Sequence, residues 1–585
     1  MSNFFGIIKK RDNFDLPDIS ALLSKNLAYK NSHFSFETDF DISIFDDDQL
    51  IVMLCGFVSN ISELCSLSND VFNSQAEGVA KIYKNNPANF QEKFLGNFVI
   101  SIFDKNKQEL VLVRDHFGAR PLYLINHKNF FAFSTNLGLL ADSELLILNI
   151  NMQTMVNFLS LQVNEGNKTF YEEIDRLEAS HILNLNKSAV HISAYSHVSS
   201  SNNKVNQRPL TAFTKKFEDA ISRSFVGKKK IGLRLSGGLD STAIAIGMKN
   251  LGIKGVETFS ANYRHLPQKH LHLTDETNYQ AAVKSVTGYN HNFVSLENIS
   301  PLESLEKQAN YFDEPIHIPN LYLFEKIAAQ AKSKNIGIIF DGNDGDTVVS
   351  HGFERFEELL RSLNFIGFIY ELCRYALFNQ VKLKQFVKSI GHNILLKWGL
   401  REKSKKNSSI VQDSVLFDSK FCNDYFQTAV DSHLDKLKSP LHALAFEYRY
   451  LIFKYYDIEI RSPFYDLELI NLCVSLPSRW KLRHGRSRYI LRSYLKGKVP
   501  DLVSQRRNKA NLIYGIIYNI EENDIKKIKK ELENIHPLLE NIINQGRISE
   551  SINLLKSKNE ITDFEVTSLL GFFSANRWLR NNQSI

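Results

Sequence analysis

The segment KIGLRLSGGLDSTAIAIGMK, residues 230–249, constrains the fold of this chain most strongly. Apolar residues alternate up to Leu235, a serine and two glycines follow, and helical spacing begins at Leu239, which predicts a strand, a tight turn and a helix. A glycine turn at a helix N-terminus leaves backbone N–H groups free, and Ser236 and Ser241 add hydroxyl donors. The turn is therefore predicted to bind a polyanion such as pyrophosphate, whereas a plain capped turn would explain Ser236 alone.

Asp240 is unexpected in a phosphate-binding turn, because its carboxylate repels phosphate. The conflict disappears if Asp240 holds a Mg²⁺ ion that the phosphates share, so Mg²⁺ is an expected cofactor. No lysine follows the second glycine of SGGLDS. The turn is therefore not the phosphate-binding loop GxxxxGKS/T.

Strands and helices alternate downstream of an amphipathic helix at 210–225. Strands are expected at 230–235, 255–261, 291–296 and 336–340, with helices at 239–249, 275–287 and 321–334. This alternation predicts a parallel, doubly wound sheet, whose ligands bind at the carboxyl ends of the strands. The residues predicted there to bind the phosphate-bearing ligand are Leu235, Ser236, Gly237, Gly238, Asp240, Ser241, Phe259, Ser260 and Gly342.

The acidic turn DGNDGD, residues 341–346, also follows one of these strands. Its spacing faintly resembles a calcium loop, but the twelfth position is Gly352 and not the glutamate that an EF-hand needs. Its place after a parallel strand favours a second Mg²⁺ ligand that faces Asp240. The two turns together predict one site at one edge of the sheet.

The first third of the chain has the pattern of antiparallel strands. Apolar strands are expected at 3–9 and 50–58, and a hairpin at 96–103 and 109–113. A helix at 151–160 and bridging strands within 171–185 follow, and the polar segment 196–208 is the expected linker. The predicted domains are residues 1–195 and 209–585, in agreement with the about two to four domains that a chain of 585 residues requires.

Composition excludes several classes of protein. Five scattered cysteines without a CxxC pair predict a reducing cytoplasm, and neither a disulfide framework nor a structural zinc site. The N-terminus lacks a signal peptide pattern, and the most apolar stretch, 365–378, is interrupted by Glu371 and Arg374 and predicts a buried helix. A net charge of +7 indicates neither nucleic acid nor membrane as a partner, and it is compatible with a homo-oligomer.

Residues 353–440, between the acidic turn and the next recognisable motif, form an expected helical insertion. Its middle is rich in lysine and arginine, at Lys382, Lys384, Lys388, Lys397, Arg401, Lys403, Lys405 and Lys406. A solvated helical face followed by a loop is the favoured interpretation. The alternative is a docking surface for an acidic peptide or a partner protein.

Several motifs together resemble one family. SGGLDS resembles the SGGxDS loop of ATP pyrophosphatases, which split ATP between the α- and β-phosphates. The resemblance implies that ATP is the second cofactor, besides Mg²⁺, and that the residues named above bind ATP and pyrophosphate. Phe5-Gly6-Ile7, LGNFVISIFD, RDHFGARPLYL, Arg461-Ser-Pro-Phe-Tyr-Asp466 and HGRSRYILR resemble motifs of the asparagine synthetase family. The resemblance implies an N-terminal-nucleophile glutaminase domain, with antiparallel sheets between helices, followed by an α/β ATP pyrophosphatase domain with a helical C-terminal part.

The resemblance also implies roles for single residues. Asp346 matches the family's Mg²⁺-binding aspartate, while Asn343 stands in place of a catalytic glutamate and Arg488 in place of a catalytic lysine. Asn343, Asp344 and Arg488 form the expected catalytic set. Arginine stays protonated, so Arg488 is expected to stabilise negative charge and not to carry protons.

The positions of the glutaminase pocket differ from the family pattern. Ser2 stands where the family has its nucleophilic terminal cysteine, and Cys55-Gly56-Phe57 replaces the Asn-Gly-Glu that holds glutamine. Loss of the thiol, the amide and the carboxylate predicts a retained scaffold without glutaminase activity. A serine glutaminase is the alternative.

The implied reaction is adenylation of a substrate carboxylate, release of pyrophosphate and coupling of the acyl-AMP to an amine. With an inactive glutaminase the favoured amine is intramolecular, as in lasso-peptide macrolactam cyclases and β-lactam synthetases, with a precursor peptide and its processing proteins as partners. The first alternative is an amidotransferase that makes asparagine or an amidated sugar acid with ammonia. The second, of another class, is a pseudo-enzyme that binds nucleotide or a partner without turnover.

Overall fold

The fold is described from a computed structural model. It describes residues 3–11, 14–17, 26–30, 33–39, 42–68, 71–162, 166–186, 189–195, 198, 208–225, 227, 229–316, 318–397, 410–412, 429–507, 509–557 and 562–582. None of the helices in these ranges is both long and apolar enough to span a membrane.

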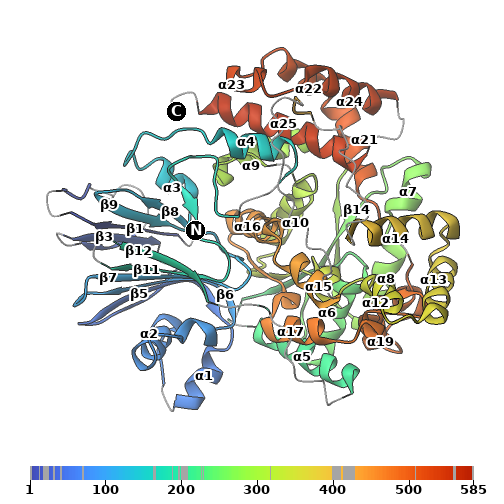
Figure 1. Cartoon of the computed structure of the whole chain (residues 1–585), viewed down its shortest axis with the longest axis horizontal. Helices are drawn as coiled ribbons and strands as arrows, with labels where there is room; N and C mark the ends of the chain where they lie inside the picture. Colours follow the sequence, from blue (N-terminus) through green and yellow to red (C-terminus); the bar gives the residue numbers. More distant parts are fainter. Residues whose placement is uncertain are drawn as a thin grey trace.

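The N-terminal part is built from two stacked antiparallel sheets, seen at the left of Figure 1. The first has the strand order β10-β8-β9-β1-β3-β2, with bounds β1 Phe4–Lys9, β2 Asn26–Lys30, β3 Phe34–Asp39, β8 Tyr123–Asn126, β9 Phe130–Ser134 and β10 Asp175–Arg176. The second has the order β12-β11-β7-β6-β5-β4, with bounds β4 Ser43–Asp46, β5 Leu50–Val58, β6 Gly96–Asp104, β7 Glu109–Arg114, β11 His181–Asn186 and β12 Ala189–Ala194. The predicted antiparallel strands and hairpin are confirmed.

Helices cover both outer faces of this pair of sheets. They are α1 Ile61–Ser68 and α2 Gln75–Asn85 on one side, and α3 Leu137–Ala141 and α4 Met152–Leu159 on the other (Figure 1). Apolar side chains of the two sheets, among them Phe36, Phe103 and Phe133, pack between them. The expected layering of sheets between helices is confirmed. The boundary between residues 195 and 209 stays a prediction, because most of the linker lies outside the described residues.

The second part contains a five-stranded sheet in the order β15-β14-β13-β16-β17, and every neighbouring pair is parallel. Its bounds are β13 Ile231–Arg234, β14 Glu257–Asn262, β15 Asn290–Ser295, β16 Ile338–Phe340 and β17 Glu459–Arg461. The helices around it are α5 Pro209–Arg223, α6 Leu239–Asn250, α7 Gln268–Thr274, α8 Thr277–Thr287, α9 Pro301–Phe312, α10 Leu321–Ser333, α11 Gly345–Val349 and α16 Pro440–Tyr455. Separate apolar clusters fill its two faces, so the doubly wound prediction is confirmed.

Three elements differ from the sequence-based expectation. Strand β17 was not expected, because its three residues include Glu459 and Arg461 and carry no apolar pattern. Helices α7 and α9 were not expected either. The C-terminal helices are α21 Ile513–Asn523, α22 Ile525–Leu532, α23 Pro537–Glu540, α24 Gln545–Ser557 and α25 Asp563–Asn581. Helix α25 is largely buried.

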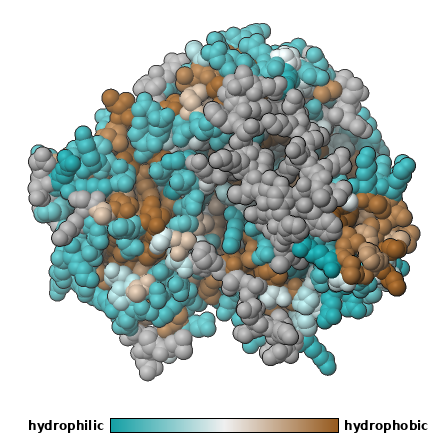
Figure 2. Space-filling view, viewed as in Figure 1, coloured by the Kyte–Doolittle hydropathy of each residue, from teal (hydrophilic) through white to brown (hydrophobic). Residues whose placement is uncertain are grey.

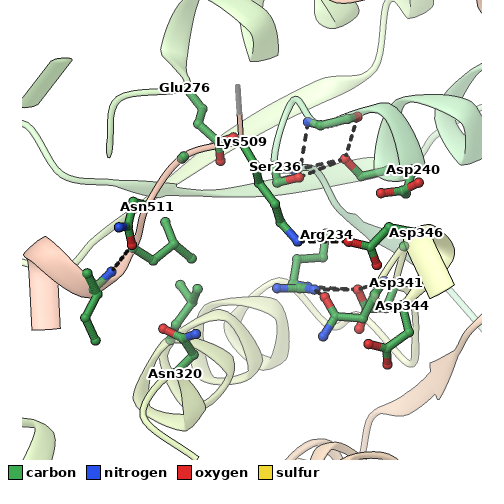
Figure 3. Close-up of a pocket in the computed structure, with 18 of the residues that line it drawn as sticks. Arg234, Ser236, Asp240, Glu276, Asn320, Asp341, Asp344, Asp346, Lys509 and Asn511 are labelled. Carbon is green, nitrogen blue, oxygen red and sulfur yellow. Dashed lines mark hydrogen bonds and ion pairs between the residues drawn. The ribbon is translucent and has the colours of Figure 1, made fainter. Parts of the chain in front are cut away.

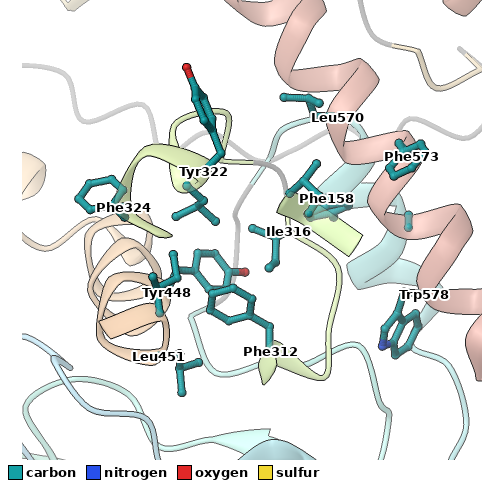
Figure 4. Packing of buried hydrophobic residues seen from close by; sticks show 14 of the residues in the cluster. Phe158, Phe312, Ile316, Tyr322, Phe324, Tyr448, Leu451, Leu570, Phe573 and Trp578 are labelled. Atoms are coloured by element: carbon teal, nitrogen blue, oxygen red, sulfur yellow. The ribbon is translucent and has the colours of Figure 1, made fainter. Parts of the chain in front are cut away.

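The two parts share a hydrophobic core, shown in Figure 4. Trp578 of α25 lies 5.7 Å from the ring of Phe170 and 5.6 Å from that of Tyr171, both in the N-terminal part. Phe158 of α4 and Tyr448 of α16 belong to the same cluster. The N-terminal part is therefore packed against the parallel-sheet part and is not a loosely tethered module.

A buried ion network joins the same two parts. Glu447 of α16 accepts from Arg114 of β7 and, at 3.2 Å, from Nε of Arg176 of β10. Arg176 also donates to Glu314, and all four side chains are almost completely buried. Because unpaired buried charges are costly, removal of one member should destabilise this interface.

The expected insertion is helical in its described residues: α12 Glu354–Arg361, α13 Phe365–Asn379, α14 Leu383–Lys397 and α15 Ala429–Leu437. Residues Arg401, Lys403, Lys405 and Lys406 lie outside the described ranges. The prediction of a buried helix at 365–378 is wrong, because Ile366 is 86% exposed and Leu377 73% exposed. Figure 2, viewed from the same side as Figure 1, shows an apolar area at the right edge, where Figure 1 places α13.

The remaining short elements connect the insertion to the C-terminal helices. They are α17 Leu467–Ser475, α18 Ser478–Lys481, β18 Leu482–Arg483, β19 Arg486–Ser487, α19 Tyr489–Leu495 and α20 Asp501–Ser504. Strands β18 and β19 form a small antiparallel hairpin. This hairpin leads directly to Arg488.

Candidate active site

A pocket of about 530 Å³ opens at the carboxyl ends of β13 and β16 (Figure 3). It is lined by residues of both predicted turns: Ser236, Gly238, Leu239, Asp240, Ser241, Asp341, Gly342, Asn343, Asp344 and Asp346. Arg488 and residues of the segment after α20 also line the pocket. The structure thus brings the two turns and Arg488 into one site, as the sequence predicts.

The SGGLDS turn presents the N-terminus of α6 to this pocket. Gly237 adopts a φ of +75°, which favours glycine, and Gly238 is the residue before the first helical turn. The Ser236 and Ser241 hydroxyls lie 3.1 Å apart, and the Ser236 backbone N–H donates to Ser241 Oγ at 3.2 Å. Gly238 to Ser241 all border the pocket, so the positive end of the helix dipole faces it.

The acidic turn packs directly onto the same helix end. A Cβ atom on Gly342 would lie 2.7 Å from the Ser241 backbone nitrogen, and one on Gly345 would lie 3.0 Å from Oδ1 of Asp240. Only glycine permits these approaches without displacing one turn from the other. The two glycines therefore fix the position of Asp346 relative to Asp240.

We expect Gly342→Ala to lower kcat/KM of the reaction proposed below by about 10²-fold, because a displacement of roughly 1 Å at a catalytic site has that effect. Steady-state kinetics of nucleotide cleavage would measure the change. Gly391→Ala is the matched control, since a Cβ there meets no atom within 4 Å. Equal activity of both variants would contradict the close packing of the turns.

Charges at the Asp240 end of the pocket are only partly paired. Oδ2 of Asp240 accepts from Nη1 of Arg488 at 2.8 Å, while the buried Oδ1 has no hydrogen-bond partner. Burial raises the pKa of the Asp240 carboxyl, Arg488 opposes this effect and the nearby Asp346 adds to it. His351, whose Nε2 lies 3.6 Å from Oδ2 of Asp346, together with Lys509 at the same distance, holds the pKa of Asp346 well below its usual range.

These carboxylates fit a Mg²⁺ ion that is shared with a nucleotide. Asp240 supplies an unpaired buried oxygen, and Figure 3 shows Asp346 beside it. Within the described part of the chain, no group of three or more His, Cys, Asp or Glu residues could hold a metal on its own. Mg²⁺ typically binds one or two carboxylates together with substrate phosphates, so two carboxylates suffice.

Two arginines hold the acidic turn in place. Arg234 donates to Oδ1 of Asp341 from Nε at 3.0 Å and from Nη2 at 2.6 Å, and it also donates to Asn343. Asp344 accepts from Arg449 at 3.0 Å. The catalytic roles assigned to Asn343 and Asp344 stay predictions, and their contacts show that both side chains also order the turn.

Arg488 follows a hairpin that is held in place by contacts with α13. It has a φ of +52° and precedes α19, directly after the β18–β19 hairpin. Glu371 of α13 accepts from the backbone N–H of Gly485 at 2.9 Å and of His484 at 3.2 Å. The backbone of Gly485 approaches Arg374 so closely that a Cβ would lie 2.2 Å from its carbonyl carbon. The inner face of α13 therefore positions the hairpin that carries Arg488.

Some predicted nucleotide residues lie behind the pocket instead of lining it. The Leu235 N–H donates to the Phe259 carbonyl at 2.8 Å, and the Ser260 hydroxyl donates to the Leu235 carbonyl. None of these three residues lines the described pocket, and Gly237 does not line it either. The Gly237 carbonyl accepts from Nη1 of Arg506 at 3.0 Å.

The sequence did not point to several lining residues. They are Arg234, Glu276, Ile318, Pro319, Asn320, Leu323, Phe324, Ala510, Asn511, Leu512, Ile513, Ile516, Asp563 and Thr567. Arg506 pairs with Glu276 at 2.6 Å, and burial raises the pKa of the Glu276 carboxyl. The missed positions belong to no sequence motif. Arg506, Arg507 and Lys509 also line the pocket, and they belong to the cluster of cations after residue 485 that the sequence predicts to face the phosphates.

The predicted glutaminase positions that the structure describes are closed. The Arg461 guanidinium lies 3.4 Å from the centre of the Phe57 ring, and Sγ of the buried Cys55 lies 3.9 Å from the Tyr450 hydroxyl. The cavity that borders Phe57 measures about 20 Å³, enough for about one water molecule. Ser2 lies outside the described residues.

Known sequences match both parts of the chain. The sequence model of asparagine synthase matches residues 212–580, and that of a glutamine amidotransferase domain matches residues 45–196. Asparagine synthetase (glutamine-hydrolyzing) 2 of Bacillus subtilis is 28% identical over 254 residues, which cover 39% of this chain and 34% of the relative.

Two further relatives align over longer stretches. Asparagine synthetase (glutamine-hydrolyzing) 1 of Bacillus subtilis is 23% identical over 503 residues, 79% of this chain and 76% of the relative. The putative asparagine synthetase (glutamine-hydrolyzing) 2 of Methanocaldococcus jannaschii is 25% identical over 375 residues, 62% of this chain and 68% of the relative. The chain thus spans about a third of the first relative and more of the other two.

Proposed function

Because the chain belongs to the asparagine synthase family, we propose that it is an ATP-dependent ligase that forms an amide and releases AMP and pyrophosphate. The observation that carries this proposal is the pocket that joins the N-terminus of α6, the Asp240–Asp346 pair and Arg488. These are the groups that cleavage between the α- and β-phosphates needs. The N–H groups bind the leaving pyrophosphate, and the cation stabilises charge that develops in the transition state.

In the proposed first step, a carboxylate oxygen of the acid attacks the α-phosphorus of ATP. The bond to the β-phosphate oxygen breaks, pyrophosphate leaves toward the SGGLDS turn, and an acyl-AMP forms. When bound at Asp240 and Asp346, Mg²⁺ neutralises charge on the phosphates. Arg488 supplies a fixed positive charge beside Asp240 and does not take up a proton, because arginine stays protonated. In the second step, an amine attacks the acyl carbon and AMP leaves.

We assign the amine to ammonia, so the product is a primary amide. The family and the glutamine-hydrolyzing relatives support this sequence-derived alternative better than ring closure, and no finding supports a likeness to lasso-peptide cyclases or β-lactam synthetases. The ammonia is proposed to come from solution. Among the described residues, Phe57 borders a cavity of only about 20 Å³ and is covered by Arg461, which argues against a glutamine pocket at this position.

Product analysis tests the proposal. Purified protein is incubated with ATP, Mg²⁺, ammonium chloride and a set of carboxylic acids, and the nucleotides are separated by chromatography. The proposal expects AMP and pyrophosphate in amounts that depend on the acid. Formation of ADP and phosphate, or no acid-dependent cleavage, would overturn it. Replacement of ammonium by glutamine is expected to support no amide formation and to release no glutamate.

Arg488→Met is expected to lower kcat for pyrophosphate release by about 10²- to 10³-fold, the cost of removing one preorganised charge-stabilising group. Arg488→Lys should recover part of this loss, because lysine restores the charge without the planar fork of donors. Stopped-time pyrophosphate assays would measure both variants. Arg483→Met, an exposed residue on the same hairpin, is the control and should leave kcat unchanged. Full activity of Arg488→Met would remove the assigned role.

A further inference from the structure

The end of the pocket away from Asp240 has a different character from the phosphate-binding end. Its lining combines the start of α10, the start of α21 and the start of α25. The apolar lining residues there are Ile318, Pro319, Leu323, Phe324, Leu512, Ile513 and Ile516, and the polar ones are Asn320, Asn511, Asp563 and Thr567. None of these lining residues is a lysine or an arginine.

We call the apolar lining residues just named the apolar wall. From this wall we propose that the acid substrate carries an apolar body of several carbons, seated between α10 and α21, and is not a small zwitterion such as aspartate. The inference rests on the proposed function, since it concerns the acid that is adenylated. It names the substrate class of the same site.

The direction of attack places the acid at this end. The attacking and leaving oxygens of a phosphorus displacement lie roughly in line. Pyrophosphate leaves at the SGGLDS turn, so the carboxylate enters from the opposite side. Figure 3 shows Asn320 and Asn511 on that side, with Arg234 between them and the Asp240–Asp346 pair.

The wall is preformed by packing. Ile516 is 1% exposed, and Leu323, Phe324 and Ile513 are also buried in the shared core. The Arg234 guanidinium lies 4.4 Å from the centre of the Phe324 ring and is already bonded to Asp341 and Asn343. Arg234 is therefore committed to the acidic turn, while the Phe324 ring stays part of the wall.

The polar groups of this end fit a neutral body better than a zwitterion. The α-carboxylate of aspartate would need a cation, and a buried charge without a partner is costly. Oδ1 of Asn320 is buried without a hydrogen-bond partner, although Asn320 precedes α10 and could have capped it. It is an acceptor for one N–H donor of the substrate, such as an amide.

Exchange of labelled pyrophosphate into ATP tests this assignment, because it reports acyl-AMP formation for each acid. The probes are 4-phenylbutanoate and N-acetylphenylalanine, with aspartate and glucuronate as polar comparisons. The inference expects kcat/KM at least about tenfold higher for the apolar acids. Faster exchange with aspartate or glucuronate would overturn the inference and leave the proposed function standing. No exchange with any acid would instead overturn the proposed function, and the inference with it.

A matched pair of variants locates the effect. Ile318→Ser, in the wall, is expected to raise KM for the apolar acid about tenfold and to leave KM for ATP within about twofold. Ile517→Ser is the control, because Ile517 is a half-buried isoleucine that lies on α21 and outside the pocket lining. This change should alter neither KM for the acid nor KM for ATP. A rise of KM for ATP alone in Ile318→Ser would show that the wall holds the nucleotide base, and would overturn the inference.

Discussion

Asp240→Asn is expected to lower pyrophosphate release at least about 10³-fold, the largest effect on activity that the structure predicts. The change removes the negative charge that pairs with Arg488 at 2.8 Å, and it replaces one carboxylate oxygen that suits a metal by an NH₂ group. It keeps the shape of the side chain at a position packed against Gly345, so the fold is preserved. Pyrophosphate assays at saturating ATP and Mg²⁺ would measure the loss.

Two controls make this result specific. Asp275→Asn changes an exposed carboxylate outside the pocket, and asparagine keeps its ability to accept from the Thr277 backbone N–H. The melting temperature of Asp240→Asn should stay within a few degrees of the parent value, because burial already raises the pKa of this carboxyl and makes its charge costly. Normal turnover by Asp240→Asn would remove the assignment of Asp240 to Mg²⁺.

Glu447→Ala is expected to lower the free energy of unfolding by about 3–5 kcal/mol, the largest effect on stability. The substitution leaves Arg114 without its carboxylate and Arg176 with Glu314 alone, in an interface where these side chains are almost completely buried. Urea unfolding followed by tryptophan fluorescence would measure it, because Trp578 reports on the shared core.

Asp457→Ala is the matched control for this prediction. Asp457 pairs with Lys332 at 2.7 Å, but both side chains are at least half exposed, and such pairs contribute about 1 kcal/mol or less. A loss of similar size in the two variants would contradict the claim that the buried network holds the two parts together. A small loss of unfolding free energy in Glu447→Ala would also contradict this claim.

The parts of the fold that follow a strong local pattern were predictable. Strand β5 is a continuous apolar run, β6 has an apolar centre, and the SGGLDS turn has a glycine where the backbone needs a positive φ. The meeting of both turns at one sheet edge follows from the parallel topology alone. Arg488 was placed by its resemblance to a motif, and the structure brings it within hydrogen-bond distance of Asp240.

The parts that depend on tertiary packing were not predictable from the sequence. Strand β17 has charged residues because Glu459 pairs with Arg120 and Arg461 covers Phe57, contacts that exist only between the two halves. The burial of α25 depends on an N-terminal partner about four hundred residues away, at Phe170 and Tyr171. The apolar wall joins residues near 320 with residues near 515, which share no motif.

Transfer of oxygen-18 from the acid to AMP tests the central claim, activation of a carboxylate by adenylation, most directly. The acid is labelled in its carboxylate and turned over with ATP, Mg²⁺ and ammonia, and AMP is analysed by mass spectrometry. The account predicts one labelled oxygen in each AMP formed, because the oxygen that attacks phosphorus stays on it when the amine displaces AMP. Label in inorganic phosphate, or AMP without label, would contradict the account.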